Sequence, residues 1–131
     1  MARPGSDHPT ELELQILKIL WQRSPLPVRD IRQALADQGR DLAHTSVITT
    51  LNIMVRKRYL KRAKQANAFL FQPRVTRAGI SKGMLGDIVD RVFDGSAKDV
   101  MLTLLEASDV DANELKEIRR FIDRQARGES P

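Results

Sequence analysis

The chain has 131 residues, no cysteine and a formal net charge of +5 at pH 7. That length fits one domain, or one small domain with a helical appendage, which can bury a core without a disulfide or metal staple. The missing cysteines exclude disulfides, thiolate metal sites and thiol nucleophiles, and the absence of any apolar run near the roughly 20 residues of a membrane span or of a signal-peptide core predicts a cytoplasmic protein without a membrane partner.

Residues 1–9 contain two prolines, a glycine and no periodicity, which predicts a flexible arm with His8 as an exposed residue. Thr10 begins a helix, and Glu13 stands three residues later, the spacing of a capping box. The buried stripe of this helix is predicted to be Leu12, Ile16, Ile19 and Leu20, with Trp21 as a large core residue.

Prolines 25 and 27 end the first helix, and the extended stretch 26–28 is a candidate edge strand that tolerates proline. A second helix is predicted over roughly 28–38, with Gly39 as its C-cap. Its inward side chains are predicted to be Val28, Ile31, Ala34 and Leu35.

Residues 43–58 have two contrasting faces at helical spacing. Val47, Leu51, Met54 and Val55 form an apolar stripe, and Thr45, Thr49, Asn52 and Arg56 form a polar stripe on the opposite side. Thr, Asn and Arg side chains suit base edges and the neighbouring phosphates. We interpret this segment as the recognition helix of a helix-turn-helix; an ordinary amphipathic helix with polar filler stays open as the alternative.

Two short segments, 59–64 and 68–72, surround Gln65-Ala66-Asn67 and predict a β-hairpin in which Asn67 has positive φ. A basic hairpin directly after a helix-turn-helix is typical of a winged helix. The alternative role of the hairpin is a cap on the core, packed through Leu60, Phe69 and Phe71, and both roles can hold together.

From these two elements we predict a DNA interface. Thr45, Ser46, Thr49 and Asn52 are expected to face base edges, with Asn52 able to make a bidentate contact to adenine. The residues expected to hold phosphates are His44, Arg56, Lys61, Arg62 and Lys64.

After Pro73 the sequence predicts three amphipathic helices, over roughly 77–93 with Thr76 as cap, 97–106, and a last one capped by Asp111 and Glu114. Their apolar stripes have little core of their own, so we expect a homodimer through this region; folding back onto the same chain is the alternative. The residues expected at the dimer interface are Ile80, Met84, Ile88, Val92, Met101, Leu104, Leu115, Ile118, Phe121 and Ile122.

Gly79, Gly83 and Gly86 share one face of the 77–93 helix, either for close helix approach or as a soft joint. Charge also divides the chain. Residues 1–80 contain 14 basic and 6 acidic residues, a net charge of +8, whereas residues 81–131 contain 8 and 11, a net charge of −3. This asymmetry indicates an N-terminal part that meets a polyanion and a C-terminal part with another task.

In order and spacing, segments 11–21, 28–31 and 45–52, followed by Tyr59-Leu60, resemble the penicillinase repressor family (BlaI/MecI/CopY). The Asp94-Gly95-Ser96 break and the last helix are similar to the dimerisation region of that family. The resemblance implies a dimeric winged-helix repressor that binds a palindromic operator upstream of regulated genes, often genes of β-lactam resistance or metal homeostasis.

The chain also departs from that family. It lacks the C-terminal cysteine motif of the copper-sensing branch, so copper sensing by that route is excluded. The Asn-Phe bond that is cut in proteolytically inactivated members is matched by Thr103-Leu104, which leaves a regulatory protease or an unknown effector open as the partner that ends repression. Ala43 and Arg58 replace a serine N-cap and a glycine that are common in the family.

The predicted fold is mainly α with a small β-hairpin wing, divided into an arm (1–9), a winged-helix DNA-binding domain (10–75) and a helical dimerisation region (76–127). The predicted function is sequence-specific repression as a homodimer on double-stranded DNA, of resistance or stress genes; a winged-helix protein-interaction module is the alternative. No Gly-rich phosphate loop and no nucleophile–base pair is present, so we expect no enzyme, no metal and no cofactor.

Overall fold

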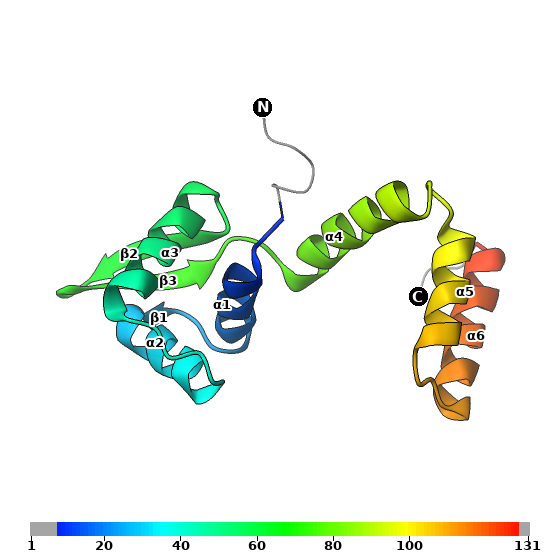
Figure 1. Cartoon of the computed structure of the whole chain (residues 1–131), viewed down its shortest axis with the longest axis horizontal. Coiled ribbons are helices and arrows are strands. Elements are labelled where there is room, and N and C mark those ends of the chain that lie inside the picture. Colours follow the sequence, from blue (N-terminus) through cyan, green and yellow to red (C-terminus); the bar gives the residue numbers. More distant parts are fainter. Residues whose placement is uncertain (1–7, 129–131) are drawn as a thin grey trace. The chain divides into compact units, whose positions relative to one another are not determined.

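The computed structural model describes residues 8–128 (Figure 1). These residues form two compact units, which divide within α4, between Asp87 and Ile88. In chain order the elements are α1 (Glu11–Gln22), β1 (Leu26–Pro27), α2 (Val28–Asp37), α3 (His44–Arg56), β2 (Leu60–Gln65), β3 (Ala68–Pro73), α4 (Arg77–Val92), α5 (Ala97–Ala107) and α6 (Ala112–Ala126). No helix among residues 8–128 is long and apolar enough to cross a membrane.

The first unit is a winged helix. Its three strands form an antiparallel sheet in the order β1-β3-β2, so the predicted edge strand and the predicted hairpin are both confirmed. The hairpin turn is the two residues Ala66 and Asn67, between the paired Gln65 and Ala68. The prediction of positive φ at Asn67 is wrong: of the two turn residues, Ala66 is the one with positive φ, 56°.

The core of this unit joins α1, α2, α3 and the sheet. The predicted stripes of the first three helices are confirmed, with Leu12, Val28, Ala34 and Val55 partly buried. Trp21 packs at the margin of the core, and its indole N–H donates to the carbonyl oxygen of Val75 over 2.9 Å. The buried apolar residues are Ile16, Leu17, Ile19, Leu20, Leu26, Ile31, Leu35, Val47, Leu51, Met54, Tyr59, Leu60 and Phe71.

The predicted helix ends are present. The hydroxyl of Thr76 accepts from the backbone N–H of Gly79, and the carboxylate of Asp111 accepts from that of Glu114. Gly39, with φ +90°, follows the last residues of α2. These local hydrogen bonds satisfy N–H groups that the first turn of a helix leaves without partners.

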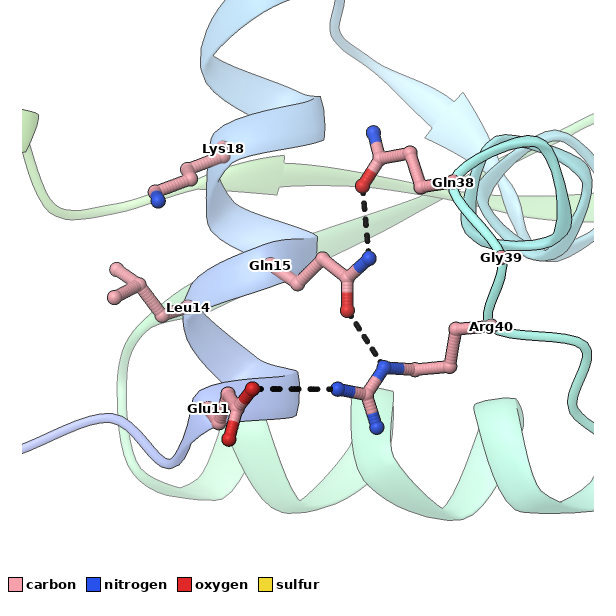
Figure 2. Close-up of a pocket in the computed structure, with 7 residues that line it drawn as sticks. All are labelled: Glu11, Leu14, Gln15, Lys18, Gln38, Gly39 and Arg40. Atoms are coloured by element: carbon pink, nitrogen blue, oxygen red, sulfur yellow. Dashed lines mark hydrogen bonds and ion pairs between the residues drawn. The ribbon is translucent and has the colours of Figure 1, made fainter.

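Polar side chains attach the link between α2 and α3 to α1 (Figure 2). The Nε of Arg40 donates to the Gln15 amide oxygen at 2.6 Å, and the Gln15 Nε2 donates to Gln38 at 2.8 Å. A longer ion pair, 3.8 Å, joins Arg40 to the exposed Glu11. The link that sets where α3 begins is therefore fixed at its first residues.

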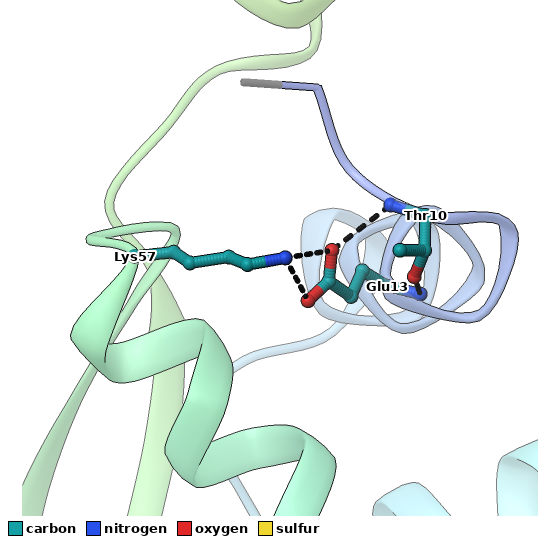
Figure 3. Close-up of polar contacts among 3 residues, drawn as sticks. All are labelled: Thr10, Glu13 and Lys57. Atoms are coloured by element: carbon teal, nitrogen blue, oxygen red, sulfur yellow. Dashed lines mark hydrogen bonds and ion pairs between the residues drawn. The ribbon is translucent and has the colours of Figure 1, made fainter. Parts of the chain in front are cut away.

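The other end of α3 is held by Glu13, which is 3% exposed (Figure 3). Its carboxylate accepts from the backbone N–H of Thr10 at 2.9 Å, while the Thr10 hydroxyl accepts from the Glu13 N–H at 3.2 Å, so the capping box is confirmed. The same carboxylate receives the ammonium of Lys57, the C-cap of α3, at 2.9 and 3.1 Å. One carboxylate thus caps α1 and anchors α3.

Residues 1–7 of the predicted arm lie outside the described residues. The other two residues of the arm, His8 and Pro9, are not exposed. Pro9 is buried, and the His8 side chain is 23% exposed, with its Nε2 3.7 Å from a carboxylate oxygen of Asp87. The prediction of an exposed His8 is wrong because the imidazole packs against α4, beside Asp87 and next to the backbone at Gly83.

The second unit contains α5 and α6, which are amphipathic as predicted but bury little. Val100 is its buried hydrophobic residue among residues 88–128, at 8% exposed. Ser96 caps α5, after a break in which Asp94 and Gly95 have positive φ. The large apolar side chains left exposed here are Ile88, Val92, Met101, Leu102, Leu104, Leu105, Leu115, Ile118, Phe121 and Ile122.

Replacing Glu13 by alanine should destabilise the winged-helix unit by about 2 kcal/mol, because it removes a capping-box partner and charge-assisted hydrogen bonds at a buried site. Urea denaturation followed by circular dichroism measures the change.

The matched control is Glu11→Ala in the same helical turn, where the carboxylate is exposed. Its effect should stay within about 0.5 kcal/mol, as for ordinary surface changes. Equal losses for the two variants would contradict an anchoring role for Glu13.

Candidate nucleic-acid interface

The polar side of α3 faces solvent along its first two turns. Val47, Leu51 and Met54 are fully buried on one side of the helix, and Thr45, Ser46 and Thr49 are exposed. Burial of the apolar stripe fixes the rotation of α3 about its axis, so the short polar side chains must point outward. They offer hydroxyl groups and methyl groups of the size that base edges accommodate.

The beginning of α3 has no side-chain cap. Ala43 is the N-cap residue and cannot supply an acceptor, and His44 beside it is exposed. The first N–H groups of a helix carry partial positive charge and bind phosphate oxygens readily. The missing cap therefore leaves donors at the edge of the polar face that a DNA backbone can use.

Asn52, the last predicted base-reading residue, differs from the exposed Thr45, Ser46 and Thr49 because its side chain has a partner within the protein. It is half-buried, and its amide oxygen accepts a hydrogen bond of 2.6 Å from the guanidinium of Arg62 on β2. The sequence assigned the two residues to separate roles, one to bases and one to phosphates. The structure brings them together, because β2 begins four residues after α3 ends and runs beside it.

Phe69 takes part in this contact and not in the core. The guanidinium carbon of Arg62 lies 5.0 Å from the centre of the Phe69 ring, and Phe69 is 46% exposed. The prediction that Phe69 packs with Leu60 and Phe71 is wrong for this residue: Phe69 and Phe71 share one face of β3, but Phe69 lies two residues nearer the hairpin tip, beyond the core.

The cations of the wing point to both of its faces. Arg62 and Lys64 share the face of Phe69, since they pair with Phe71 and Phe69, and Lys61 points to the other face. All three are exposed. Cations around a projecting hairpin form the positive surface that phosphates require.

Segment 56–64 is rich in Lys and Arg, but one of its cations, Lys57, is not available to this surface. Its ammonium binds Glu13, an acidic residue 44 positions away in the sequence. Arg56 and Arg58 remain exposed. Arg58 has φ 67°, in the left-handed region, which gives a backbone reason for the glycine that the resembling family often has there.

Two further arginines, which the sequence analysis did not assign, lie beside His44. Arg29 and Arg32 of α2 line a hollow of about 280 Å³ together with His44 and Asp41. Arg32 also donates to the carbonyl oxygen of Leu42 at 2.7 Å. Their spacing of three residues on a helix was the available signal, because it places them on one side of α2.

Neither the possible metal ligands of the described residues nor the hollow beside Gln15 indicates a metal or substrate site. Within residues 8–128, no group of three or more His, Asp or Glu side chains is placed to hold a metal ion. A hollow of about 540 Å³ is lined by Gln15, Gln38 and Arg40, and the polar groups of these side chains are hydrogen-bonded to one another (Figure 2).

Comparison with known proteins matches residues 9–124 to the family model described as penicillinase repressor. The transcriptional regulator BlaI of Mycobacterium tuberculosis (strain H37Rv) is 30% identical over 114 residues, which cover 86% of this chain and 80% of that protein. The methicillin resistance regulatory protein MecI of Mammaliicoccus sciuri is 20% identical over 113 residues, 86% of this chain and 91% of that protein. MecI of Staphylococcus aureus (strain N315) is 19% identical over the same lengths.

If Arg29 contacts a phosphate, Arg29→Met should weaken binding to every duplex and reduce the slope of log affinity against log salt by about 0.9 for each copy of the chain on DNA. Fluorescence anisotropy over a salt series measures this slope.

Lys98→Met removes a cation from α5 and serves as the control, with an unchanged slope expected. A slope that Arg29→Met also leaves unchanged would remove Arg29 from the interface.

Proposed function

Because the chain belongs to the penicillinase repressor family, a family of DNA-binding transcriptional repressors and not of enzymes, we propose that it acts as a homodimer on a palindromic operator. Two copies related by a two-fold axis present two recognition helices to two half-sites of opposite orientation. The half-sites then lie about one helical turn apart, or a multiple of it.

The observation that carries the DNA-reading part is the outward polar face of α3 on a fully buried apolar back. Thr45, Ser46 and Thr49 read base edges in this proposal, and Asn52 reads one together with its neighbour on the wing. The residues that hold phosphates are His44, Arg56, Lys61, Arg62 and Lys64, joined by Arg29 of α2.

The support for a dimer is the apolar surface of the second unit. Soluble monomers rarely leave large apolar side chains grouped on short helices, and such patches usually mark interfaces. In α6 the exposed set repeats at helical spacing, from Leu115 and Ile118 to Phe121 and Ile122. A second copy of the same helices buries this stripe against itself.

The target genes are proposed by analogy with the relatives. MecI is named a methicillin resistance regulatory protein, and we propose resistance or stress genes as the targets of this chain. Thr103 and Leu104 lie inside α5 and not in a loop, so a protease that cuts between them needs that helix to unfold first.

The test combines DNA selection with an interface variant. The full-length protein, mixed with genomic fragments and random competitor at physiological salt, should retain a few fragments that share an inverted repeat. Ile118→Lys should shift sedimentation from dimer to monomer and lower affinity for those fragments at least tenfold, because each half-site alone supplies half of the contacts.

Asn113→Lys adds the same charge to the polar side of α6 and should change neither property. Unaltered helix content by circular dichroism shows that the variants fold. Selection of no shared sequence by the wild-type protein would overturn the function, and a specific complex that is monomeric would overturn the dimer.

A further inference from the structure

Arg62 connects the wing to the recognition helix through a single side chain. Its guanidinium donates to the Asn52 amide oxygen at 2.6 Å and lies 5.0 Å from the centre of the Phe69 ring. Contacts on α3 and on β3 therefore define where this cation sits. A solvated phosphate contact needs neither partner, so the arrangement calls for another explanation.

The chemistry of the pair fixes the orientation of the Asn52 amide. A guanidinium has only hydrogen-bond donors, so the amide must turn its oxygen toward Arg62 and its NH₂ group away from it. The oxygen retains a second lone pair, but a donor that approaches it meets a positive charge 2.6 Å from the same atom. Asn52 therefore offers a base its NH₂ group, as a donor, and not its oxygen.

This orientation changes which base suits Asn52. A bidentate contact to adenine needs the amide oxygen to accept from adenine N6 while the amide NH₂ donates to N7. With the oxygen engaged by Arg62, the first of these two bonds is lost or weakened. Guanine presents two acceptors, N7 and O6, in the major groove, and both suit the NH₂ group that Asn52 still offers.

We propose that Arg62 is a specificity-determining residue, which holds Asn52 as a donor and directs the pair to guanine in place of adenine. The proposal rests on the DNA-reading function proposed above and adds to it the base that is read. Arg62 acts here through Asn52, whereas Lys64, two residues along the same face of β2, holds phosphate only.

Arg62→Met tests the proposal on the full-length protein, because it removes the donors and keeps the length of an exposed side chain. Sequence preferences of wild type and variant are measured by selection from a library of randomised operators. Wild type should prefer guanine at one position of each half-site. In the variant the freed amide should move that preference toward adenine, with a change of about tenfold or more in the guanine-to-adenine ratio, as one bidentate contact provides.

Lys64→Met is the matched control: it should lower affinity for all sequences alike and leave the preference unchanged. Asn52→Ala should abolish preference at that position, and combining it with Arg62→Met should add no further change in the ratio. Uniform weakening by Arg62→Met, as for Lys64→Met, would overturn the proposal while the repressor function stands. A wild-type protein that selects no sequence at all would instead overturn the function itself.

Discussion

The position of the recognition helix depends on one buried carboxylate. Glu13 closes the capping box of α1 through its Oε1 and binds the ammonium of Lys57, at the end of α3, through both carboxylate oxygens. A carboxylate buried without such partners is costly, and Lys57 together with the Thr10 N–H supplies them. The ion pair therefore ties the first helix to the last turn of α3, and through the following turn it also fixes where β2 and the wing start.

The recognition helix, the wing and the second unit have different surfaces, and each surface suits a different kind of contact. The back of α3 is fully buried, which holds its short polar side chains in a defined direction; base reading requires that precision. The wing is exposed and rich in cations, which suits contacts whose value lies in charge and not in shape. The second unit leaves its large apolar side chains exposed, so in the proposed homodimer the stability that its own core lacks is coupled to assembly. Arg62 is the exception, since it is a wing cation bound to a side chain of the reading helix.

Periodicity and local capping were enough to predict every helix, the edge strand and the hairpin, because those features depend on neighbours within a few residues. The sequence could not pair Glu13 with Lys57 or Asn52 with Arg62, since these contacts depend on how separate elements pack. The same limit explains Phe69: alternation along β3 places it on the core face, but only the three-dimensional extent of the core shows that the hairpin tip projects beyond it. The burial of His8 could not be predicted because the helix against which it packs, α4, is far along the chain.

In the proposed homodimer, two copies of α3 enter two successive major grooves on one side of the DNA. A hydroxyl-radical footprint of the full-length protein, on a fragment that the protein itself selects, measures this arrangement. We expect two protected patches related by a two-fold axis, with centres separated by about 10 base pairs or a multiple of that distance. A single patch without symmetry, or protection spread evenly along the fragment, would contradict it.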